Sequence, residues 1–504
     1  MDVGSIGIWL MAFSAAFFAW LGIRAVRGHR LTLEDHLVCR NTAGSGTGAA
    51  TVAASVIGAW VLFSPAETAM WAGLAGVAGY ALGQAAPLFG FAWLGPRLRR
   101  LMPSGHSLAE YVHHRYGRPM HLLTLIIMVF YMFVFLAAEL TAIAQAIRLV
   151  ADVPLFWTAL VVAVATVAYT SYGGLRASIF TDRIQFMLIV PLLLCLVIGT
   201  FVVLGGTGPA LDTARQETPH LFSFTHLAGV EFGITLVIAI LAANMFHQGF
   251  WQRVYACRDE RTLRRAYGLA GLMVIPMVMI AGVFGLVAIS SGLADGSASV
   301  ALFAVIIDTL PGWMIWLVLV LAIALVMSSM DTLLNGIAST VTSDLARIRP
   351  DWTAARLLRF TRWTTALLAI PAIGIAAQGH SVLYLFLVAD LACAGALFPV
   401  FYGLFVRRFT GTGAMVSTVI GILVGTLYFP APDFTPWLNI PFAGSFLISF
   451  AAALLVSTLV ALGWHGVAIW AKRTPCFDFT ILAERVLLLG EKSNPPAIDG
   501  RISL

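Results

Sequence analysis

Residues 121–149 read HLLTLIIMVFYMFVFLAAELTAIAQAIRL, an apolar run that holds few charged side chains. A helix needs roughly 20 apolar residues to cross the hydrocarbon core of a bilayer. The run lacks the alternation of a barrel strand, and only helices and closed barrels pair every backbone group inside a membrane. The stretch therefore predicts a membrane-spanning helix, and similar runs recur along the chain.

The composition of the whole chain agrees with a membrane protein. Of its 504 residues, 60% are hydrophobic and only 11% are charged, whereas a soluble domain carries about 25% charged residues. The net charge of +6 does not indicate a nucleic-acid partner, because the basic residues recur in short loops between apolar runs. The five cysteines form no CxxC pair and no histidine cluster accompanies them, so neither a disulfide framework nor a zinc site is predicted.

The apolar runs predict an all-α polytopic membrane protein with about 13 transmembrane helices. With the N-terminus outside and the spans alternating, every Lys and Arg except Arg148 and Arg215 falls on the cytoplasmic side, as the positive-inside rule requires. Basic residues follow the first run rather than precede it, which predicts a retained first helix instead of a cleaved signal. We expect an inner (cytoplasmic) membrane location and a cytoplasmic C-terminus. The predicted spans are 5–25, 43–68, 70–95, 121–149, 155–172, 183–205, 227–250, 266–290, 313–342, 364–378, 381–405, 412–429 and 441–470.

Ionisable side chains within spans are costly and mark candidate functional positions. Glu67 and Glu231 are explained equally well as solvated helix ends near an interface. Glu139 lies deep in its run, which favours a role that faces a cavity. Asp390 fits a pairing role within the bundle and a substrate contact equally well. Asp331 belongs to a polar segment of the ninth span.

The second and ninth spans suggest an ion site. Residues 44–70 read GSGTGAATVAASVIGAWVLFSPAETAM, rich in small residues and interrupted by Pro65. Small residues permit close helix packing, but the proline also predicts a discontinuous helix whose freed carbonyls bind an ion. Residues 321–345 read LAIALVMSSMDTLLNGIASTVTSDL, and two adjacent hydroxyls opposite such carbonyls suit a monovalent cation.

Three motifs resemble those of the sodium:solute symporter family, and the resemblance covers roughly residues 5–470. The first is AYTSYGGLRASIFTDRIQ at 168–185, similar to the signature loop of that family. The second is MSSMDTLLN at 327–335, and the third is NMFHQGFWQR at 244–253. The stretch MPSGHSLAEY at 102–111 is also similar to a loop of urea-active transporters.

The resemblance implies a LeuT-type core of two inverted five-helix repeats. It divides the chain into a first helix and loop, two repeats, two further helices and a cytoplasmic tail, at 1–42, 43–205, 206–408, 409–470 and 471–504. It also implies a sodium site that takes carbonyls from the second span and hydroxyls from the ninth. The implied sodium ligands are Ala53, Val56, Leu325, Ser328 and Ser329.

The resemblance carries over further residues. Asp182 matches an aspartate linked to sodium release, and Asp331 lies near where some members bind a second sodium. If the two approach each other, they form an inner cation site. For the solute, the resemblance implies Asn244 and His247, with Trp60, Phe135 and Glu139 beside them. Trp60 and Phe135 replace polar side chains of the sugar symporters, which favours urea or an amide-like or amino-acid-like solute over a sugar.

We therefore expect a sodium-coupled symporter that imports a small polar organic solute by alternating access. One alternative is proton coupling through Glu139 or Asp390, because burial favours a protonated carboxyl. Another is a transporter-like membrane sensor that needs a partner protein. The spans contain no HExxH, GxSxG or paired metal-ligand motif, so no enzyme is predicted. Sodium is the expected coupling ion, and the expected partners are the solute and the lipid bilayer, with no nucleic acid and no obligate protein partner.

Overall fold

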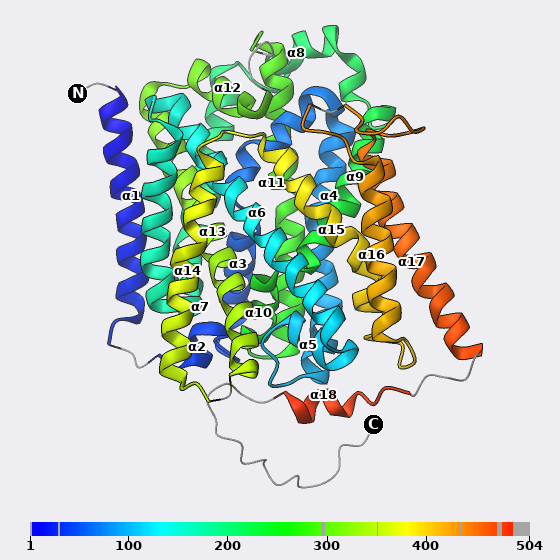
Figure 1. Cartoon of the computed structure of the whole chain (residues 1–504). Helices are drawn as coiled ribbons and strands as arrows, with labels where there is room; N and C mark the ends of the chain where they lie inside the picture. Colours follow the sequence, from blue (N-terminus) through cyan, green and yellow to red (C-terminus); the bar gives the residue numbers. More distant parts are fainter. Residues whose placement is uncertain are drawn as a thin grey trace.

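The computed structural model describes residues 3–28, 31–293, 298–349, 351–433, 435–470 and 476–486. Within these ranges the chain folds into helices that run the length of the molecule, with shorter helices at both ends (Figure 1). The all-α prediction is confirmed. The long helices are α1 (Val3–Val26), α4 (Ser64–Leu101), α6 (Arg118–Ala151), α7 (Leu155–Val203), α9 (Leu227–Met245), α11 (Glu260–Ser290), α13 (Gly312–Ile348), α14 (Ala354–Ala376), α15 (Val382–Tyr402), α16 (Gly411–Tyr428) and α17 (Phe446–Trp470).

Shorter helices complete the bundle. At one end, called here the α5 end, lie α2, α5 and α18, and at the opposite α8 end lie α8 and α12 (Figure 1). Most of these segments belong to stretches that the sequence analysis treated as loops. The shorter helices are α2 (Leu33–Leu37), α3 (Ser45–Val56), η1 (Ala59–Leu62), α5 (Leu108–Tyr116), α8 (Thr207–Glu217), η2 (Pro219–Phe222), α10 (Gln248–Ala256), η3 (Ala298–Val300), α12 (Ala301–Thr309) and α18 (Thr480–Arg485).

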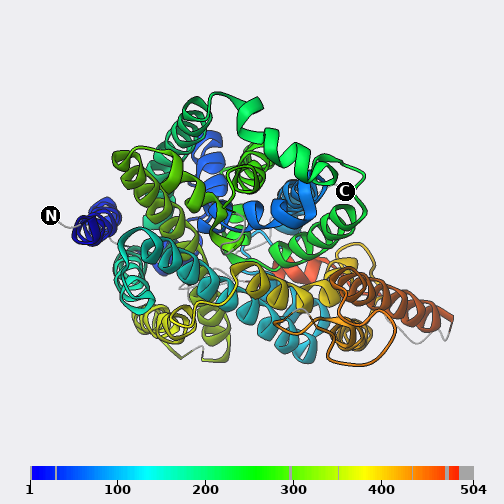
Figure 2. The ribbon, with the colours of Figure 1, turned by 90° about the horizontal axis from the view of Figure 1, so that it is seen from above.

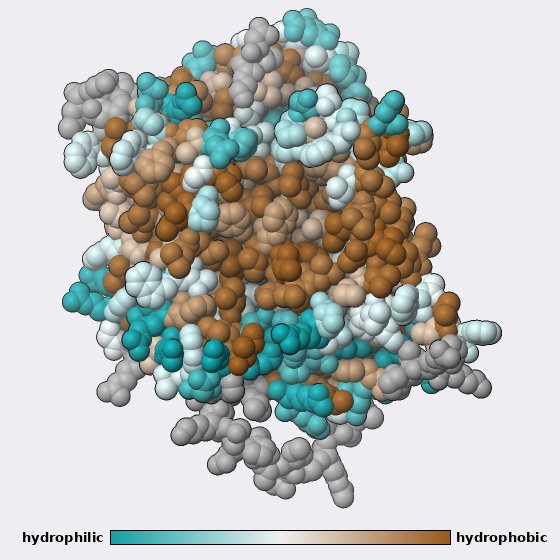
Figure 3. Space-filling model, viewed as in Figure 1, coloured by the Kyte–Doolittle hydropathy of each residue, from teal (hydrophilic) through white to brown (hydrophobic). Residues whose placement is uncertain are grey.

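The outer surface carries a broad apolar belt with polar side chains gathered at both ends (Figure 3). Exposed large side chains such as Trp93, Trp157 and Leu423 contribute to the apolar surface. Viewed from above, α1 lies at one edge of the bundle, and α16 and α17 project at the opposite edge (Figure 2). This distribution is typical of a membrane protein whose apolar belt contacts lipid and whose polar ends contact water.

Ten helices of the described residues are long and apolar enough to cross a membrane. Two of the ten contain a glycine with non-helical backbone angles, Gly73 in α4 and Gly174 in α7. Both have positive φ, at 63° and 56°, and a Cβ at either position would collide with backbone atoms of Leu221 or His36. Two helices meet at each glycine. The count of 13 spans stays a prediction.

The expected signature loop is largely helical, which corrects the boundary between the fifth and sixth predicted spans. The chain turns at Gly174 and continues in α7 without a loop through residues 175–203. Asp182 is therefore held on a helix. Residues 377–381 do separate α14 from α15, as predicted for this weakly marked boundary.

Two spans are interrupted in the middle of the bundle. α3 ends at Val56, and Ile57 and Gly58 are extended before η1 and α4 continue. The predicted discontinuity is present, but it lies before Pro65 rather than at it. Pro65 occupies the first turn of α4, where a proline needs no backbone partner. The second interruption separates α9 from α10 at Phe246 and His247, and it was not predicted.

Glycines bring α4 and α9 into backbone contact. A Cβ on Gly79 would lie 2.1 Å from the Cα of Gly233, and one on Gly229 would lie 2.1 Å from the carbonyl oxygen of Ala72. Only residues without a side chain permit such an approach. The close packing sets the distance between two helices that both line the central cavity.

Candidate functional site

The interruption after Val56 leaves backbone carbonyls of α3 at the centre of the bundle. The carbonyl oxygen of Ala53 accepts a hydrogen bond from the amide of Ile57 at 3.0 Å. That of Val56 accepts one from the Trp60 indole at 3.0 Å. The carbonyl of Ala54, between them, accepts from a hydroxyl of another helix. The end of a broken helix therefore presents several oxygens to its surroundings.

The partner of Ala54 is Ser328 on α13. Its hydroxyl donates to the carbonyls of Ala54 and Leu325, both at 2.9 Å. The hydroxyl of Ser329 lies 3.3 Å from the same Leu325 oxygen. Both serines are buried. The structure thus brings the predicted sodium ligands of α3 and α13 together, with Ala54 rather than Ala53 or Val56 in direct contact with Ser328.

Glu139 on α6 completes this group. One of its carboxylate oxygens accepts from the Ser329 hydroxyl at 2.7 Å and from the amide of Ala59 at 2.8 Å. The other oxygen is buried and has no hydrogen-bond partner. The sequence analysis gave Glu139 to the solute site, but the structure places it against the helix break and Ser329. Glu139 therefore places a carboxyl group beside the oxygen-rich group.

Asp182 and Asp331 do lie in one buried network, towards the α5 end. The Ser178 hydroxyl donates to Asp331 at 2.6 Å, and the Tyr169 hydroxyl donates to Asp331 at 2.8 Å. Asp182 accepts from Thr51 and, at 2.8 Å, from the guanidinium of Arg253.

Arg253 supplies a positive charge to this network. Its guanidinium also donates to Thr332 at 2.8 Å and to the carbonyl of Gly249 at 3.0 Å, and its side chain is only 1% exposed. The sequence analysis counted Arg253 as a residue of a cytoplasmic loop. The structure instead buries it beside the two carboxylates that were proposed to hold a cation.

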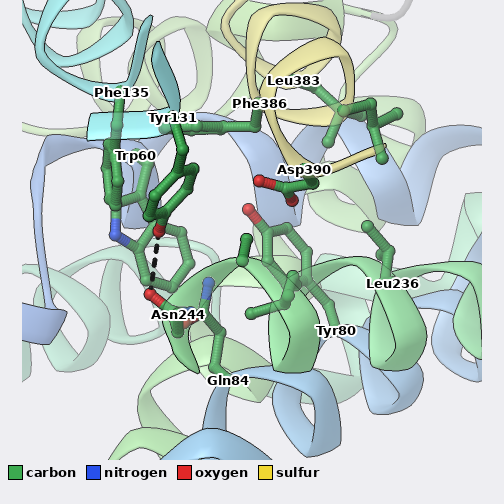
Figure 4. A pocket seen from close by; sticks show the side chains of 13 residues that line it. Trp60, Tyr80, Gln84, Tyr131, Phe135, Leu236, Asn244, Leu383, Phe386 and Asp390 are labelled. Carbon is green, nitrogen blue, oxygen red and sulfur yellow. Dashed lines mark hydrogen bonds between the residues drawn. The ribbon is translucent and has the colours of Figure 1, made fainter. Parts of the chain in front are cut away.

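A small cavity lies between four helices and η1 (Figure 4). Its volume is about 30 Å³, and a single water needs about 10–15 Å³. Trp60, Phe135 and Asn244, three of the predicted solute residues, line it. Tyr131 donates to the Asn244 side-chain oxygen at 3.1 Å. Further lining side chains are Tyr80 and Gln84 of α4, Leu236 and Ile240 of α9, and Leu383, Phe386, Leu387 and Asp390 of α15.

His247 does not line the cavity but packs behind two residues of α6 that do, Tyr131 and Phe135. Its ring packs edge-on against Tyr131 and Phe135, with centroids 6.0 Å apart in each pair. It stacks on Phe250 at 4.2 Å and caps α10 by accepting from the amide of Gly249 at 3.1 Å. His247 therefore supports the cavity from the second helix break.

A model of the sodium:solute symporter family matches residues 37–421 of the chain. The chain belongs to this family. The predicted membership is confirmed, and the chain is a membrane transporter of small-molecule solutes rather than an enzyme. The helix break facing two serines, described above, lies within the matched residues.

Two relatives and one solved structure are similar to the chain. A spermidine transporter of Candida albicans is 28% identical over 75% of this chain and 72% of its own length. A urea-proton symporter of Oryza sativa is 22% identical over 82% of this chain and 63% of its own length. A Na⁺-coupled sialic acid symporter superposes with a TM-score of 0.75 at 17% identity, covering 92% of this chain and 98% of that one. The predicted LeuT-type fold is confirmed.

Several lining residues of this family member were missed by the sequence analysis. Tyr131 lies four residues before Phe135, and Tyr80 lies four residues before Gln84, so each pair shares one helix face. That spacing could have found Tyr131 once Phe135 was chosen. Asp390 was singled out as a buried charge but not joined to the cavity, because its neighbours there come from distant parts of the chain.

A second charged group closes the α5 end and is called here the His106 cluster, comprising Glu34, Arg40, His106 and Glu110. The His106 ring lies 2.9 Å from a Glu34 oxygen and 3.4 Å from a Glu110 oxygen. Arg40 pairs with Glu34 at 2.7 Å. Burial alone would lower the pKa of His106, but the two carboxylates outweigh it and raise the pKa to about 9. The imidazole is therefore charged at neutral pH.

The His106 cluster is tied to the second broken helix. Gln248, the first residue of α10, donates to the His106 carbonyl at 2.6 Å. Arg40 donates to the carbonyls of Pro103 and Gly105 at 2.7 and 2.9 Å. These contacts hold residues 102–107 against α10 at the α5 end of the bundle.

Proposed function

We propose that this protein is a sodium-coupled symporter that imports a small polar organic solute by alternating access. The proposal rests chiefly on one observation, the contact of the broken helix α3 with the serine pair of α13. Sodium takes oxygen ligands, and carbonyl and hydroxyl oxygens converge there from two helices. The family description and the sodium coupling of the structurally similar sialic acid symporter agree with this choice of ion.

In this mechanism sodium replaces a direct hydrogen bond as the link between α3 and α13. In the structure, the Ser328 hydroxyl donates a hydrogen bond to the carbonyl oxygen of Ala54. A bound cation would turn the lone pairs of Ser328 and Ser329 towards itself and draw on the neighbouring carbonyls. The Glu139 carboxylate, 2.7 Å from the Ser329 hydroxyl oxygen, would balance the charge of the bound sodium. Sodium binding thereby fixes η1 and Trp60, which line the solute cavity, and the coupling is reciprocal between the two ligands.

The solute of the proposed cycle is urea or an amide-like, amino-acid-like or amine-bearing metabolite. The aromatic lining from Trp60 and Phe135 supports a solute other than a sugar. The named substrates of the relatives, spermidine and urea, are both nitrogen-rich. We propose that the α8 end, where α1 begins, faces the outside and that the α5 end faces the cytoplasm, so that solute and sodium enter at the α8 end and leave at the α5 end.

Replacing one serine ligand tests the sodium site. Ser328→Ala should weaken sodium binding by about tenfold or more, a change of about 1.4 kcal/mol, because it removes a ligand that bridges both helices. Sodium binding to the purified full chain is measured as the sodium-dependent rise in melting temperature. Ser339→Ala is the matched control, since Ser339 is buried on the same helix and its hydroxyl donates to the carbonyl of Gly336 within that helix. Wild-type sodium affinity in Ser328→Ala would contradict the assignment.

Glu139 supports proton coupling as the second candidate. Its unpartnered buried oxygen lies beside the helix break and could hold a proton in place of sodium nearby. Solute uptake into sodium-free proteoliposomes, driven by an inward pH gradient and abolished in Glu139→Gln, would favour the proton. Uptake that needs a sodium gradient at constant pH would favour sodium.

A further inference from the structure

Asp390 is a buried carboxyl group on the wall of the central cavity. It comes from the middle of α15, is 4% exposed, and lines the central cavity. Among the described residues, none pairs with its carboxylate through a hydrogen bond or ion pair. Figure 4 shows the carboxylate directed towards the cavity, beside the hydroxyl end of the Tyr80 side chain. Ionisable side chains inside a membrane protein are usually paired with another side chain or with backbone carbonyls.

Aromatic rings line the same cavity as this carboxylate. Trp60 stacks on Tyr80 with centroids 5.4 Å apart. Phe386 packs edge-on against Phe135 at 4.8 Å, and Phe135 packs against Tyr131 at 5.9 Å. Aromatic faces attract cations, and more strongly when water is excluded. A cavity lined by a carboxyl group and several aromatic faces has the chemistry of an organic-cation site.

The size of the cavity restricts what can lie beside Asp390. At about 30 Å³ it has room for a compact group and not for a bulky one. The side chains of Gln84 and Asn244 add polar atoms to the same space. A primary ammonium or a guanidinium group carries several N–H donors on a small head and satisfies both features.

We propose that the transported solute is an organic cation whose ammonium or guanidinium group pairs with Asp390. The inference rests on the proposed function, because it takes this cavity as the transport site. Within it, Asp390 supplies the counter-charge and the aromatic rings of Trp60, Tyr80 and Tyr131 enclose the cationic head. Urea, which has the shape of guanidinium without its charge, then binds weakly.

Matched pairs of probes test the charge requirement. Binding of guanidinium and urea, and of methylammonium and methanol, is measured by calorimetry on the purified full chain in nanodiscs with saturating sodium. Each pair has similar size and differs by one positive charge. We expect both cations to bind about tenfold or more tightly than their neutral counterparts. Asp390→Asn should lower cation affinity by about tenfold or more and leave the neutral probes unchanged.

Glu231→Gln is the control variant, because Glu231 is an exposed carboxylate on α9 that does not line the cavity. It should bind the cations as the wild type does. A sodium-dependent rise in melting temperature that survives in Asp390→Asn shows that this variant is folded. Equal affinity for guanidinium and urea, failure of both cations to bind, or unchanged cation affinity in Asp390→Asn would each overturn the proposal.

The two proposals fail in different ways. If Asp390 instead carries a proton, lowering the pH should strengthen urea binding, and the protein should bind the cationic and neutral probes equally well. That result overturns the inference about the organic cation and leaves the sodium proposal intact. If sodium has no effect on stability but the cations still bind through Asp390, the sodium assignment fails and the cation site stands.

Discussion

Two groups of buried carboxylates lie in the same bundle and differ in how their charge is met. Asp182 and Asp331 are surrounded by donors from α3, α7, α10 and α13, and Arg253 supplies a positive charge within the protein. Asp390, in the cavity, has aromatic neighbours, and no hydrogen bond or ion pair joins its carboxyl group to another residue that the structure describes. The first group holds the helices to one another. The second leaves a place for a charge that comes from outside.

The difference changes how the inner aspartates are interpreted. The sequence analysis proposed that Asp182 and Asp331 form an inner cation site, and the structure does bring them together. However, the guanidinium of Arg253 already donates to Asp182 at 2.8 Å and to Thr332 at 2.8 Å. A fixed cation of the chain occupies the network where a mobile one was proposed. The inner sodium site therefore stays a prediction that must account for Arg253.

Replacing Arg253 should have the largest effect on the stability of the protein. Arg253→Met leaves two fully buried carboxylates without their cation, and losing one partner of a buried ion pair costs about 3–5 kcal/mol. The melting temperature of the purified protein should fall sharply. Arg261→Met, at an exposed position of α11, is the control and should change stability by less than about 0.5 kcal/mol. Adding Asp182→Asn to Arg253→Met should restore part of the loss, and an unchanged melting temperature in the single variant would contradict this account.

The His106 cluster sharpens the comparison because its cation can lose its proton, whereas Arg253 keeps its charge. The pKa of His106 is raised to about 9 in the folded protein, against about 6.5 in an unfolded chain. Its contribution to stability is therefore full below pH 6.5 and lost as the pH rises through about 9. The free energy of unfolding that this pKa difference contributes at low pH is roughly 3 kcal/mol.

Melting curves between about pH 6 and pH 10 measure this loss. His106→Asn should melt lower than the wild type near neutral pH, and the gap should close above about pH 9. A gap that stays constant with pH would show that the imidazole charge contributes nothing.

Asp390→Asn should have the smallest effect on stability. Because the carboxylate has no partner to lose, its neutralisation removes a desolvation cost instead of an interaction. We expect the melting temperature in solute-free buffer to stay the same or rise, by on the order of 1 kcal/mol. Asp331→Asn is the comparison, since Asp331 accepts from Ser178 and Tyr169, and it should destabilise. A large destabilisation by Asp390→Asn would mean that Asp390 has a structural partner.

The sequence predicted the elements of the fold whose signal is local. Apolar length located the spans, and the density of hydroxyls located the serine pair of α13. Pro65 indicated a discontinuous helix but misplaced its interruption, because proline in a first helical turn stabilises a helix start. The break at Phe246 and His247 has no proline and is held by packing, so no local signal marked it.

The site could be predicted only where one helix carries the whole pattern. Ser328 and Ser329 are neighbours in the chain, and their hydroxyls indicated an ion site. The cavity combines α4, α6, α9, α15 and η1, and no spacing in the sequence links Asp390 to Tyr80 or Trp60. Arg253 was misplaced for a related reason: counting basic residues by loop does not reveal which of them turns inward to meet a carboxylate.

The glycine contact between α4 and α9 bears on how the cavity can open. With Gly79 against Gly233 there is no clearance for one helix to slide or rotate past the other. Tyr80, Gln84 and Asn244 therefore form a wall of fixed shape. The opposite wall, from α6 and α15, carries Phe135 and Asp390. We expect passage through the protein to follow from the second wall swinging against the first, so that the solute's charged head travels with the movable side.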